Sequence, residues 1–384
     1  MSKEFSILID CTSLVVGGGI QAGLSALRFA VDEPQLRVHL ACSSLFWAEV
    51  PPVVRARIAS TLINSTRNRW ERFRFASRVS KYERFIVPKV TFTVFGPAYW
   101  TPTRPRLQGF AVPRLIYPEI RIPIHDRFLG APSDWVETRL KTAYLRRSKM
   151  DLFVVETATV KRRLAKHALV PESRISIIGN TVSPMFFEHS NPQVMRGPTP
   201  PYNVLVPSSY YPHKNLEFIP RVANALRSML PDHFVFTFCI PLQSHGWARI
   251  ERVTKDLQVG SHIRTIGQVP HHEFHRLYAG ADVVFLPTLL ECSSAVYPES
   301  FASARPLVTT DADFSRELCG NAALYCSTTD PRDAATKILV ALTNLEVRER
   351  LVESGKAQLA QTYTTPELKW HKQLGLLQEL GGNC

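Results

Sequence analysis

Strand-like segments alternate with helix-like stretches through most of the second half of the chain, and this alternation limits the possible folds more than any other feature. Five such segments follow one another, namely Val204–Val206, Val235–Ile240, Ile263–Ile266, Ala281–Pro287 and Leu307–Thr310. Short apolar runs are typical of strands buried on both faces. Strands that alternate with helices form a parallel sheet with right-handed crossovers. We therefore predict an α/β fold for this half.

The first half opens with the same pattern. A strand is expected at Phe5–Cys11, a helix at Ile20–Val31 and a second strand at Leu36–Cys42. Gly17-Gly18-Gly19 lies between the first strand and the helix, and glycines there allow a close approach of the backbone to a ligand. The glycines lack the Gly-x-Gly-x-x-Gly spacing, so a ligand loop and a mobile turn both remain open. We predict two Rossmann-like, doubly wound parallel-sheet domains that face a cleft.

The length of 384 residues favours two domains of ordinary size. The stretch between Glu188 and Pro201 has the composition of a linker, with several prolines close together. We therefore expect four parts: a first domain over 1–187, the linker over 188–201, a second domain over 202–365, and a C-terminal helix over 366–384 that packs back on the first domain.

The net charge of +13 is concentrated in the first domain. Residues 1–185 contain 28 Lys and Arg against 14 Asp and Glu, whereas the remainder contains 18 against 19. An excess of one sign on one domain indicates an anionic partner: a membrane surface, a lipid phosphate or a nucleic acid. We expect an anionic membrane surface, and no nucleic acid.

Cations and aromatic residues are interleaved between residues 46 and 87. The cations are Arg55, Arg57, Arg67, Arg69, Arg72, Arg74, Arg78, Lys81 and Arg84, and the aromatic residues are Phe46, Trp47, Trp70, Phe73, Phe75, Tyr82 and Phe85. This mixture suits the boundary between lipid headgroups and acyl chains. It also suits stacking on single-stranded nucleic acid, or a solvated basic face above a few core aromatics.

Several broad classes of protein do not fit the chain. No apolar run reaches the roughly 18 residues of a membrane-spanning helix, and Met1 leads into the first strand without a signal-peptide pattern. The seven cysteines are scattered and form no Cys-x-x-Cys pair, which favours a reduced compartment over a disulfide framework or a zinc site. We expect a cytoplasmic protein, peripheral at the inner face of a membrane.

The candidate site is the stretch Thr288–Ala302, where a strand is followed by a small-residue loop and a helix that Pro298 is expected to open. In open α/β sheets, phosphorylated ligands bind where a strand's carboxyl end faces a helix N-terminus. A nucleotide-sugar would find N–H donors near Ser294-Ala295-Val296, a cation in Lys214, a ribose acceptor in Glu299 and a sugar acceptor in Glu291. Alternatively, Glu299 only complements the helix dipole and Glu291 is a surface carboxylate.

The pair Glu291 and Glu299, with seven residues between them, resembles the paired-glutamate motif of the retaining GT-B glycosyltransferases, family 4. Further segments are similar to that family in the expected order. They are Ser176–Val182, Val206–Asn215 with Lys214 in the place of the phosphate lysine, Gly267–Val269 through Ala281-Asp282, and Pro306–Glu317.

The resemblance implies a retaining transfer of a hexose from a nucleotide-diphospho-sugar donor, with no protein nucleophile and no metal or other cofactor. Glu291 would hold the donor sugar and Lys214 the diphosphate, and these two are the candidate catalytic residues. Glu299 would hold the ribose, Gln268 and Val269 the nucleobase, and Gly18 and Gly19 would face the reacting centre. The acceptor would be a glycan or lipid-linked glycan, as in synthesis of lipopolysaccharide, O-antigen or capsule.

The chain departs from the family pattern in places. Ser209, with Ser208 beside it, stands where the family has an arginine, so either donor binding is weaker or another basic residue such as Arg305 or Arg316 supplies the second cation. Cys292-Ser293-Ser294 replaces a smaller glycine-rich loop. No histidine aligns with the one that many members carry in the first domain, and His125 is only a candidate for it. Asp311-Ala312-Asp313 is interpreted as a surface turn, not as a metal motif. Two alternatives stay open: a sugar-nucleotide epimerase of the same fold, and a basic nucleic-acid-binding protein without catalysis.

Overall fold

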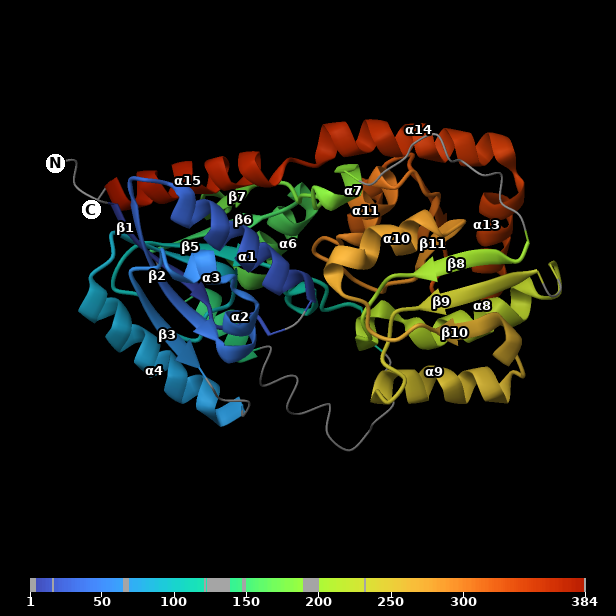
Figure 1. Ribbon diagram of the computed structural model, residues 1–384, viewed down its shortest axis with the longest axis horizontal. Helices are drawn as coiled ribbons and strands as arrows, with labels where there is room; N and C mark the ends of the chain where they lie inside the picture. The colour runs from blue at the N-terminus through green and yellow to red at the C-terminus, as the bar shows by residue number, and fades with distance from the viewer. Residues whose placement is uncertain are drawn as a thin grey trace. The chain divides into compact units, whose positions relative to one another are not determined.

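The computed structural model contains two compact units, each built on one parallel sheet (Figure 1). The first unit comprises Met1–Pro118, Asp126–Gly179 and Thr365–Cys384, and the second comprises Glu119–His125 and Asn180–Thr364. The structure describes residues 5–15, 17–64, 69–120, 122, 139–146, 150–188, 200–230 and 233–382. Most of the expected linker, residues 189–199, lies outside these ranges. The division between the units falls at Gly179 and Asn180, ahead of that linker.

The first unit contains a seven-stranded parallel sheet. Its spatial order is β3 (Ser60–Asn64), β2 (Leu36–Ser43), β1 (Phe5–Cys11), β4 (Val90–Gly96), β5 (Arg106–Phe110), β6 (Asp151–Val155) and β7 (Ile175–Ile177). Its longer helices are α1 (Gly17–Asp32), α4 (Arg69–Ile86), α6 (Ala158–Ala168) and α15 (Pro366–Gly382), and the short ones are α2 (Ser44–Glu49) and α3 (Pro52–Arg55). The chain reverses its direction of travel across the sheet between β1 and β4, which is the doubly wound order.

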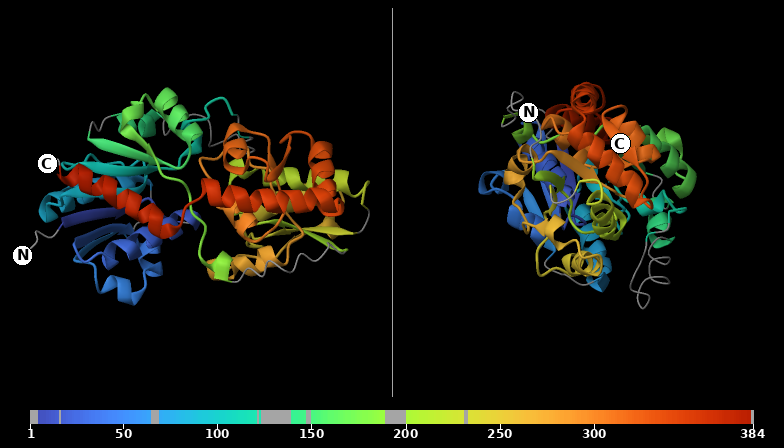
Figure 2. Two further views of the ribbon diagram at one scale, coloured as in Figure 1. Left: turned by 90° about the horizontal axis from the view of Figure 1, so that it is seen from above. Right: turned by 90° about the vertical axis from the view of Figure 1, so that its right-hand side faces the viewer.

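Helices cover both faces of this sheet. Ile7 and Ile9 of β1 pack in one core with α1 and with Leu374 and Leu377 of α15. Leu8 of the same strand packs on the opposite face, in a core with the α4 residues Phe75, Ala76 and Val79. Successive side chains of a strand point to opposite faces, so this arrangement follows directly from the strand's apolar run. The C-terminal helix α15 lies along β4 and β5 in the first unit (Figure 2).

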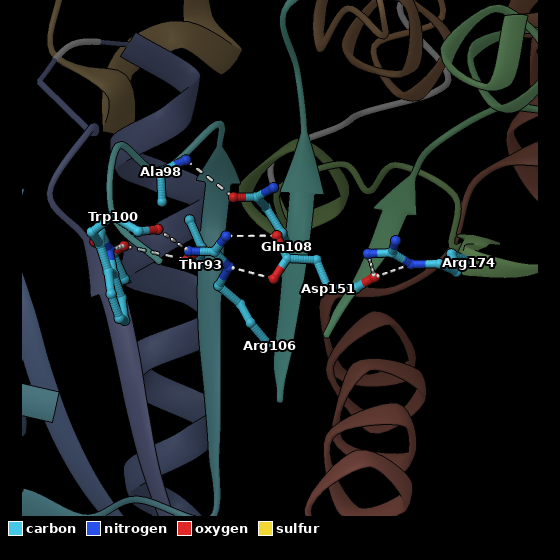
Figure 3. Close-up of polar contacts among 8 residues, drawn as sticks. Thr93, Ala98, Trp100, Arg106, Gln108, Asp151 and Arg174 are labelled. Carbon is cyan, nitrogen blue, oxygen red and sulfur yellow. Dashed lines mark hydrogen bonds and ion pairs between the residues drawn. The ribbon is translucent and has the colours of Figure 1, made fainter. Parts of the chain in front are cut away.

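A buried ion pair joins neighbouring strands of the first sheet (Figure 3). Arg106 of β5 donates two hydrogen bonds to the Asp151 carboxylate of β6, at 3.0 and 2.6 Å, and both side chains are almost fully buried. The Asp151 carbonyl in turn accepts hydrogen bonds from the Arg174 guanidinium, at 2.8 and 2.5 Å. The Arg106 guanidinium also donates a hydrogen bond of 3.1 Å to the Trp100 carbonyl. These partners all belong to the first unit, so we interpret the group as structural.

The second unit contains a six-stranded parallel sheet. Its spatial order is β10 (Ile263–Thr265), β9 (Phe234–Phe238), β8 (Tyr202–Val206), β11 (Val283–Leu286), β12 (Leu307–Thr310) and β13 (Ala323–Cys326). Its α-helices are α7 (Met185–Glu188), α8 (Ile219–Leu226), α9 (His245–Asp256), α10 (Phe274–Ala279), α11 (Val296–Ala302), α12 (Asp313–Cys319), α13 (Pro331–Thr343) and α14 (Leu345–Thr362). Val204 and Val206 pack with α8, α9 and α13, and Leu205 packs on the other face with α10, α11 and α12.

The α/β class and the two doubly wound sheets confirm the expectation from the sequence. Two edge strands, β3 and β13, were not expected. More than half of β3 is polar, and β13 has only four residues, so neither gives a strong strand pattern. The three glycines do not form a loop, because α1 begins at Gly17 and includes them in its first turn. Helix α11 begins at Val296, so Pro298 is its third residue and does not open it.

Candidate functional site

The candidate site lies at the carboxyl edge of the second sheet. After β8 the chain proceeds through β9 to β10 on one side, and it then crosses to β11 on the other side. The gap between the loops that follow β8 and β11 is therefore the topological switch point, where open α/β sheets bind ligands. Lys214 lies in the short helical turn η3 (Pro212–Lys214) after β8, and Glu291 lies in the loop after β11.

Lys214 and Glu291 form an ion pair across this switch point. The Lys214 ammonium donates a hydrogen bond to Oε1 of Glu291, and the two side chains are 13% and 7% exposed. A buried carboxylate needs a cation or hydrogen-bond donors to remain charged at low energetic cost. The pair therefore places a positive and a negative charge side by side at the switch point, where a phosphorylated ligand would bind.

Thr288 holds the same carboxylate from a second side. Its hydroxyl is fully buried and lies 3.0 Å from Oε1 of Glu291 and 3.1 Å from the carbonyl oxygen of His213. The Leu290 carbonyl oxygen also lies 3.3 Å from this hydroxyl. The hydroxyl proton can serve any one of the three acceptors, so this one side chain links the loop of Glu291 to the turn of Lys214. The Thr288 carbonyl accepts a hydrogen bond of 2.6 Å from Thr310 of β12, which fixes Thr288 itself.

The turn that carries Lys214 is held by its neighbours on both sides. The backbone N–H of Leu289 donates to the His213 carbonyl at 2.7 Å. Asn215 adopts the left-handed conformation, which asparagine tolerates, and its amide donates to the Thr328 carbonyl beyond β13 at 3.2 Å. The turn that carries Lys214 is thus held by the loops that follow β11 and β13. The position of Lys214 in the sequence alone could not show these contacts.

Glu299 lies in α11 and is buried, and among the residues that the structure describes no cation forms an ion pair with it. The Tyr278 hydroxyl of α10 donates a hydrogen bond of 2.6 Å to its Oε2. Burial raises the pKa of Glu299 to about 7, and the hydrogen bond from Tyr278 opposes that rise only in part. Burial, and then the nearby Glu299 carboxylate, raise the pKa of Tyr278 well above its usual value, so Tyr278 remains a donor at neutral pH.

Replacing Glu299 by glutamine should stabilise the protein at alkaline pH. The folded state raises the pKa of this carboxyl from 4.5 to about 7. The folded protein thus binds more protons than the unfolded chain between these values, and stability falls as pH rises through that window. Above pH 7 the penalty reaches at most about 3 kcal/mol. Thermal unfolding at pH 4 and pH 8 should therefore show a higher Tm for Glu299→Gln at pH 8 only.

The matched control for that comparison is Glu349→Gln, which neutralises an exposed carboxylate on α14. It should move the Tm equally little at both pH values. If Glu299→Gln gives the same Tm difference at pH 4 and pH 8, the buried carboxylate carries no such penalty.

The loop between the two glutamates is held in place. Cys292 and Ser294 are buried, while Ser293 accepts a hydrogen bond of 2.9 Å from the Asn180 side-chain amide. The carbonyl of Asn180 accepts the backbone N–H of Thr364 at 3.0 Å, so the contact partner is also anchored. The loop between Glu291 and Glu299 is therefore held in one conformation. Cys292, Ser293 and Ser294 determine the shape of this side of the candidate site.

Helix α11 begins directly after this loop. Ala295 precedes the helix, is exposed, and provides no side-chain cap for it, and Val296 is its first residue and is buried. An uncapped first turn leaves backbone N–H groups for another acceptor.

The other expected residues of this domain lie at the same carboxyl edge. Ser208 and Ser209 follow β8; Ser208 is buried and donates to the Ser209 carbonyl at 3.1 Å, whereas Ser209 is exposed. Gln268 and Val269 follow β10, with Gln268 exposed. Gly267 precedes them with a φ of +79°, a conformation that favours glycine.

The two arginines that could replace the missing family arginine are both occupied. Arg305 precedes β12 and so lies at the amino edge of the parallel sheet, opposite Glu291, where it donates to the Ala279 carbonyl at 2.7 Å. Its expected role as a second phosphate cation is therefore wrong. Arg316 of α12 donates two hydrogen bonds of 2.8 Å to Asp311, so its charge is already paired.

Two further expectations concern residues outside this unit or outside the described ranges. Gly18 and Gly19 lie in the first turn of α1, where a Cβ at Gly18 would meet no atom within 4 Å. Gly18 is therefore not required by packing. His125 lies outside the described residues, and the structure gives no account of it.

Across the described ranges, no helix is long and apolar enough to cross a membrane, and no group of three His, Cys, Asp or Glu side chains is arranged to hold a metal ion. Thr288 and Tyr278 are the functional candidates that spacing did not reveal. A hydroxyl three residues before Glu291 could have drawn attention to Thr288, but Tyr278 reaches Glu299 only through the packing of α10 against α11.

The comparisons with known proteins fit this geometry. Residues 191–358 match the family model described as glycosyl transferases group 1. No curated protein sequence matches the chain significantly. The family match covers the second sheet and the whole Lys214–Glu291 site.

Solved structures resemble almost the whole chain. Sucrose-phosphate synthase from Thermosynechococcus elongatus has 13% identity and a TM-score of 0.76, over 99% of this chain and 100% of that one. WaaG, a glycosyltransferase involved in lipopolysaccharide biosynthesis, has 13% identity and a TM-score of 0.74, over 97% and 99%. HepE from Anabaena, in complex with UDP and glucose, has 12% identity and a TM-score of 0.70, over 98% and 100%. The chain therefore has the GT-B fold of glycosyltransferases, and its residues 191–358 match the model of the group 1 glycosyl transferases.

Proposed function

We propose that this protein is a retaining glycosyltransferase that moves a hexose from a nucleotide-diphospho-sugar to a glycan or lipid-linked glycan. The observation that carries the proposal is the Lys214–Glu291 ion pair at the switch point of the second sheet. It combines a cation for a diphosphate with an acceptor for sugar hydroxyls, in the unit that matches the group 1 model. The structure of HepE with UDP and glucose shows that a protein of this fold binds such ligands.

The proposed roles follow from the chemistry of each side chain. Lys214 would neutralise the diphosphate, and the uncapped start of α11 would donate backbone N–H groups to it. Glu291 would accept hydroxyls of the donor sugar, and Glu299 those of the ribose, with Tyr278 holding Glu299 in place. Ser208 and Ser209 would flank the diphosphate, and Gln268 and Val269 the nucleobase.

The proposed reaction needs no protein nucleophile and no metal. The bond between C1 of the sugar and the diphosphate oxygen breaks, and the acceptor oxygen forms its bond to C1 on the same face. The departing diphosphate takes the acceptor's proton. The protein would contribute the positive charge at the leaving group and the alignment of the two substrates. We extend the proposal to an acceptor of O-antigen or capsule synthesis; WaaG, which has the same fold, is involved in lipopolysaccharide biosynthesis.

Thr288→Val should weaken the reaction by misplacing Glu291. Valine keeps the shape of threonine but removes the hydroxyl that reaches Glu291 and the His213 carbonyl. A buried acceptor that loses its donor costs about 1–3 kcal/mol, so we expect kcat/KM to fall about 10- to 100-fold. The measurement is steady-state kinetics with thermal unfolding alongside.

Thr288→Ser serves as the matched control, because it restores the hydroxyl and removes only a methyl group. It should recover most of the activity. Equal losses for the valine and serine variants would mean that packing, and not the hydroxyl, is what Thr288 contributes.

The direct test is incubation with radiolabelled UDP-, GDP-, dTDP- and ADP-hexoses, with and without a glycan acceptor fraction and with EDTA in a parallel arm. Label should pass from one donor to the acceptor, EDTA should leave the rate unchanged, and NMR should show the donor's anomeric configuration in the product. Conversion of the nucleotide-sugar to an isomer without acceptor would instead identify an epimerase. Inversion of the anomeric centre would contradict a retaining reaction.

A further inference from the structure

The exposed face of helix α4 carries positive charge and no negative charge over the part whose side chains are described. Between Phe75 and Ile86 the exposed residues recur at helical spacing, which places them on one stripe. They are Ser77, Arg78, Lys81, Arg84 and Phe85. Lys89, just beyond the helix, is exposed as well. We call Arg78, Lys81, Arg84, Phe85, Val87 and Lys89 the α4 surface.

The one carboxylate in this part of α4 points inward. Glu83 is buried and accepts hydrogen bonds from the backbone N–H groups of Thr103 and Arg104 and from the Thr103 hydroxyl, at 2.9 to 3.1 Å. Within the described ranges, no ion pair involves the exposed cations of the α4 surface. Their charge is therefore available to an anionic partner.

Two large apolar side chains stand among these cations. Phe85 is 84% exposed and Val87 is 53% exposed. Val87 follows the last residue of α4 and has a φ of +47°, in the left-handed region where glycine is preferred and a β-branched residue is strained. An exposed valine at this position improves neither packing nor backbone geometry, so the fold gives no reason for it.

We propose that the α4 surface binds an anionic lipid bilayer, with Phe85 and Val87 entering the boundary between headgroups and acyl chains and the four cations contacting the headgroups. Cations that surround exposed apolar side chains are what such a boundary attracts. A single strand of nucleic acid fits less well, because it uses a series of aromatic platforms and gains little from an aliphatic side chain. The proposal does not depend on the transfer reaction.

The C-terminal end of the α4 surface lies at the amino edge of the first sheet, away from the carboxyl edge at which Gly18 and Gly19 lie. Helix α4 connects β3 to β4, two parallel strands, so it runs back across the sheet, and its last turn lies at the amino edge beside Lys89 and β4. Gly18 and Gly19 lie at the opposite, carboxyl edge, in the helix that follows β1. A bilayer at the amino edge would therefore leave the carboxyl edge of the first unit open to substrates.

The test is flotation of the full chain with vesicles of phosphatidylcholine alone and of an equimolar mixture with phosphatidylglycerol. The protein should float with the mixed vesicles and not with phosphatidylcholine, and salt at about 0.5 M should weaken the binding. Phe85→Ser should reduce partitioning at least about tenfold. Lys81→Glu with Arg84→Glu should reduce it at least about tenfold more, since each cation near the surface contributes about fivefold.

Val87→Gly separates binding from folding. Glycine relieves the strained conformation while it removes the apolar side chain, so this variant should keep or raise the Tm and yet bind vesicles more weakly. Leu368→Ser, which removes an apolar residue 48% exposed on α15, and Arg350→Glu, which reverses an exposed charge on α14, should bind as the unaltered protein does.

Three results would overturn the proposal. The first is failure of the unaltered protein to bind the mixed vesicles. The second is vesicle binding that Phe85→Ser and Val87→Gly, shown to be folded by circular dichroism, leave unchanged. The third is tight binding to single-stranded DNA that Phe85→Ser weakens, together with no vesicle binding. Because flotation needs no donor or acceptor, none of these outcomes bears on the proposed reaction.

Discussion

Lys214→Ala should lower kcat/KM for sugar transfer by about 10²- to 10³-fold, the usual effect of removing one group that stabilises developing charge. Lys214 is the one cation that the structure places against Glu291 at the switch point within the described part of the second unit. The family's arginine is replaced by Ser209, while Arg305 lies at the wrong edge and Arg316 is paired with Asp311. With neither of these two arginines in place as a second cation, the loss should fall at the severe end of this range.

The measurement is steady-state kinetics with the donor that the labelling experiment identifies. Lys255→Ala is the matched control, because it removes a lysine that is paired with Glu251 on the surface of α9 and far along the chain from the site. It should keep full activity. A Lys214→Ala variant that retains activity within a factor of a few would mean that the diphosphate is neutralised elsewhere.

Glu291→Gln should reduce kcat by about 10³-fold or more while the protein remains folded. Glutamine keeps the size of the side chain but loses the charge that pairs with Lys214 and the strength with which sugar hydroxyls are held. The effect should appear in kcat more than in nucleotide binding, because the nucleotide is held by other groups. Glu353→Gln, at an exposed carboxylate paired with Lys356, should be silent.

The two variants should also be coupled. Removing either partner leaves a largely buried charge without its counter-ion, so each single change should destabilise the fold. The double change Lys214→Ala with Glu291→Gln should lower the free energy of unfolding by less than the sum of the two single changes, as measured by urea unfolding. If the two changes in the free energy of unfolding simply add, the interaction between Lys214 and Glu291 does not stabilise the fold. A fully active Glu291→Gln would contradict the proposed role outright.

The sequence alone predicted the α/β architecture. It also predicted that Lys214 and Glu291 follow strand ends. Five strand-like segments of the second half became strands, because continuous apolar runs are buried wherever a parallel sheet is covered on both faces. Lys214 and Glu291 were expected at one edge of the sheet, since both follow strands, and the structure places them in contact. In a parallel sheet, residues that directly follow strands lie at the same edge, so this edge can be predicted from the sequence.

Other features depended on tertiary packing and could not be read from the chain. Arg305 is close to Glu291 in sequence, yet the intervening helix α11 returns the chain to the opposite edge of the sheet. Tyr278 meets Glu299 only because α10 packs against α11. Glu299 was expected to accept ribose hydroxyls or, alternatively, only to complement the helix dipole, and neither role predicted that burial raises its pKa to about 7.

The central claim is that the Lys214–Glu291 edge of the second unit binds a nucleoside diphosphate, and a thermal-shift comparison of UDP, GDP, dTDP and ADP tests it most directly. A ligand at a hundredfold excess over its Kd stabilises the folded state by about 2.7 kcal/mol. One of the four nucleotides should therefore raise the Tm by several degrees, and Lys214→Ala should lose most of that rise while Lys255→Ala keeps it. If none of the four raises the Tm, or if Lys214→Ala responds as the unaltered protein does, the claim is contradicted.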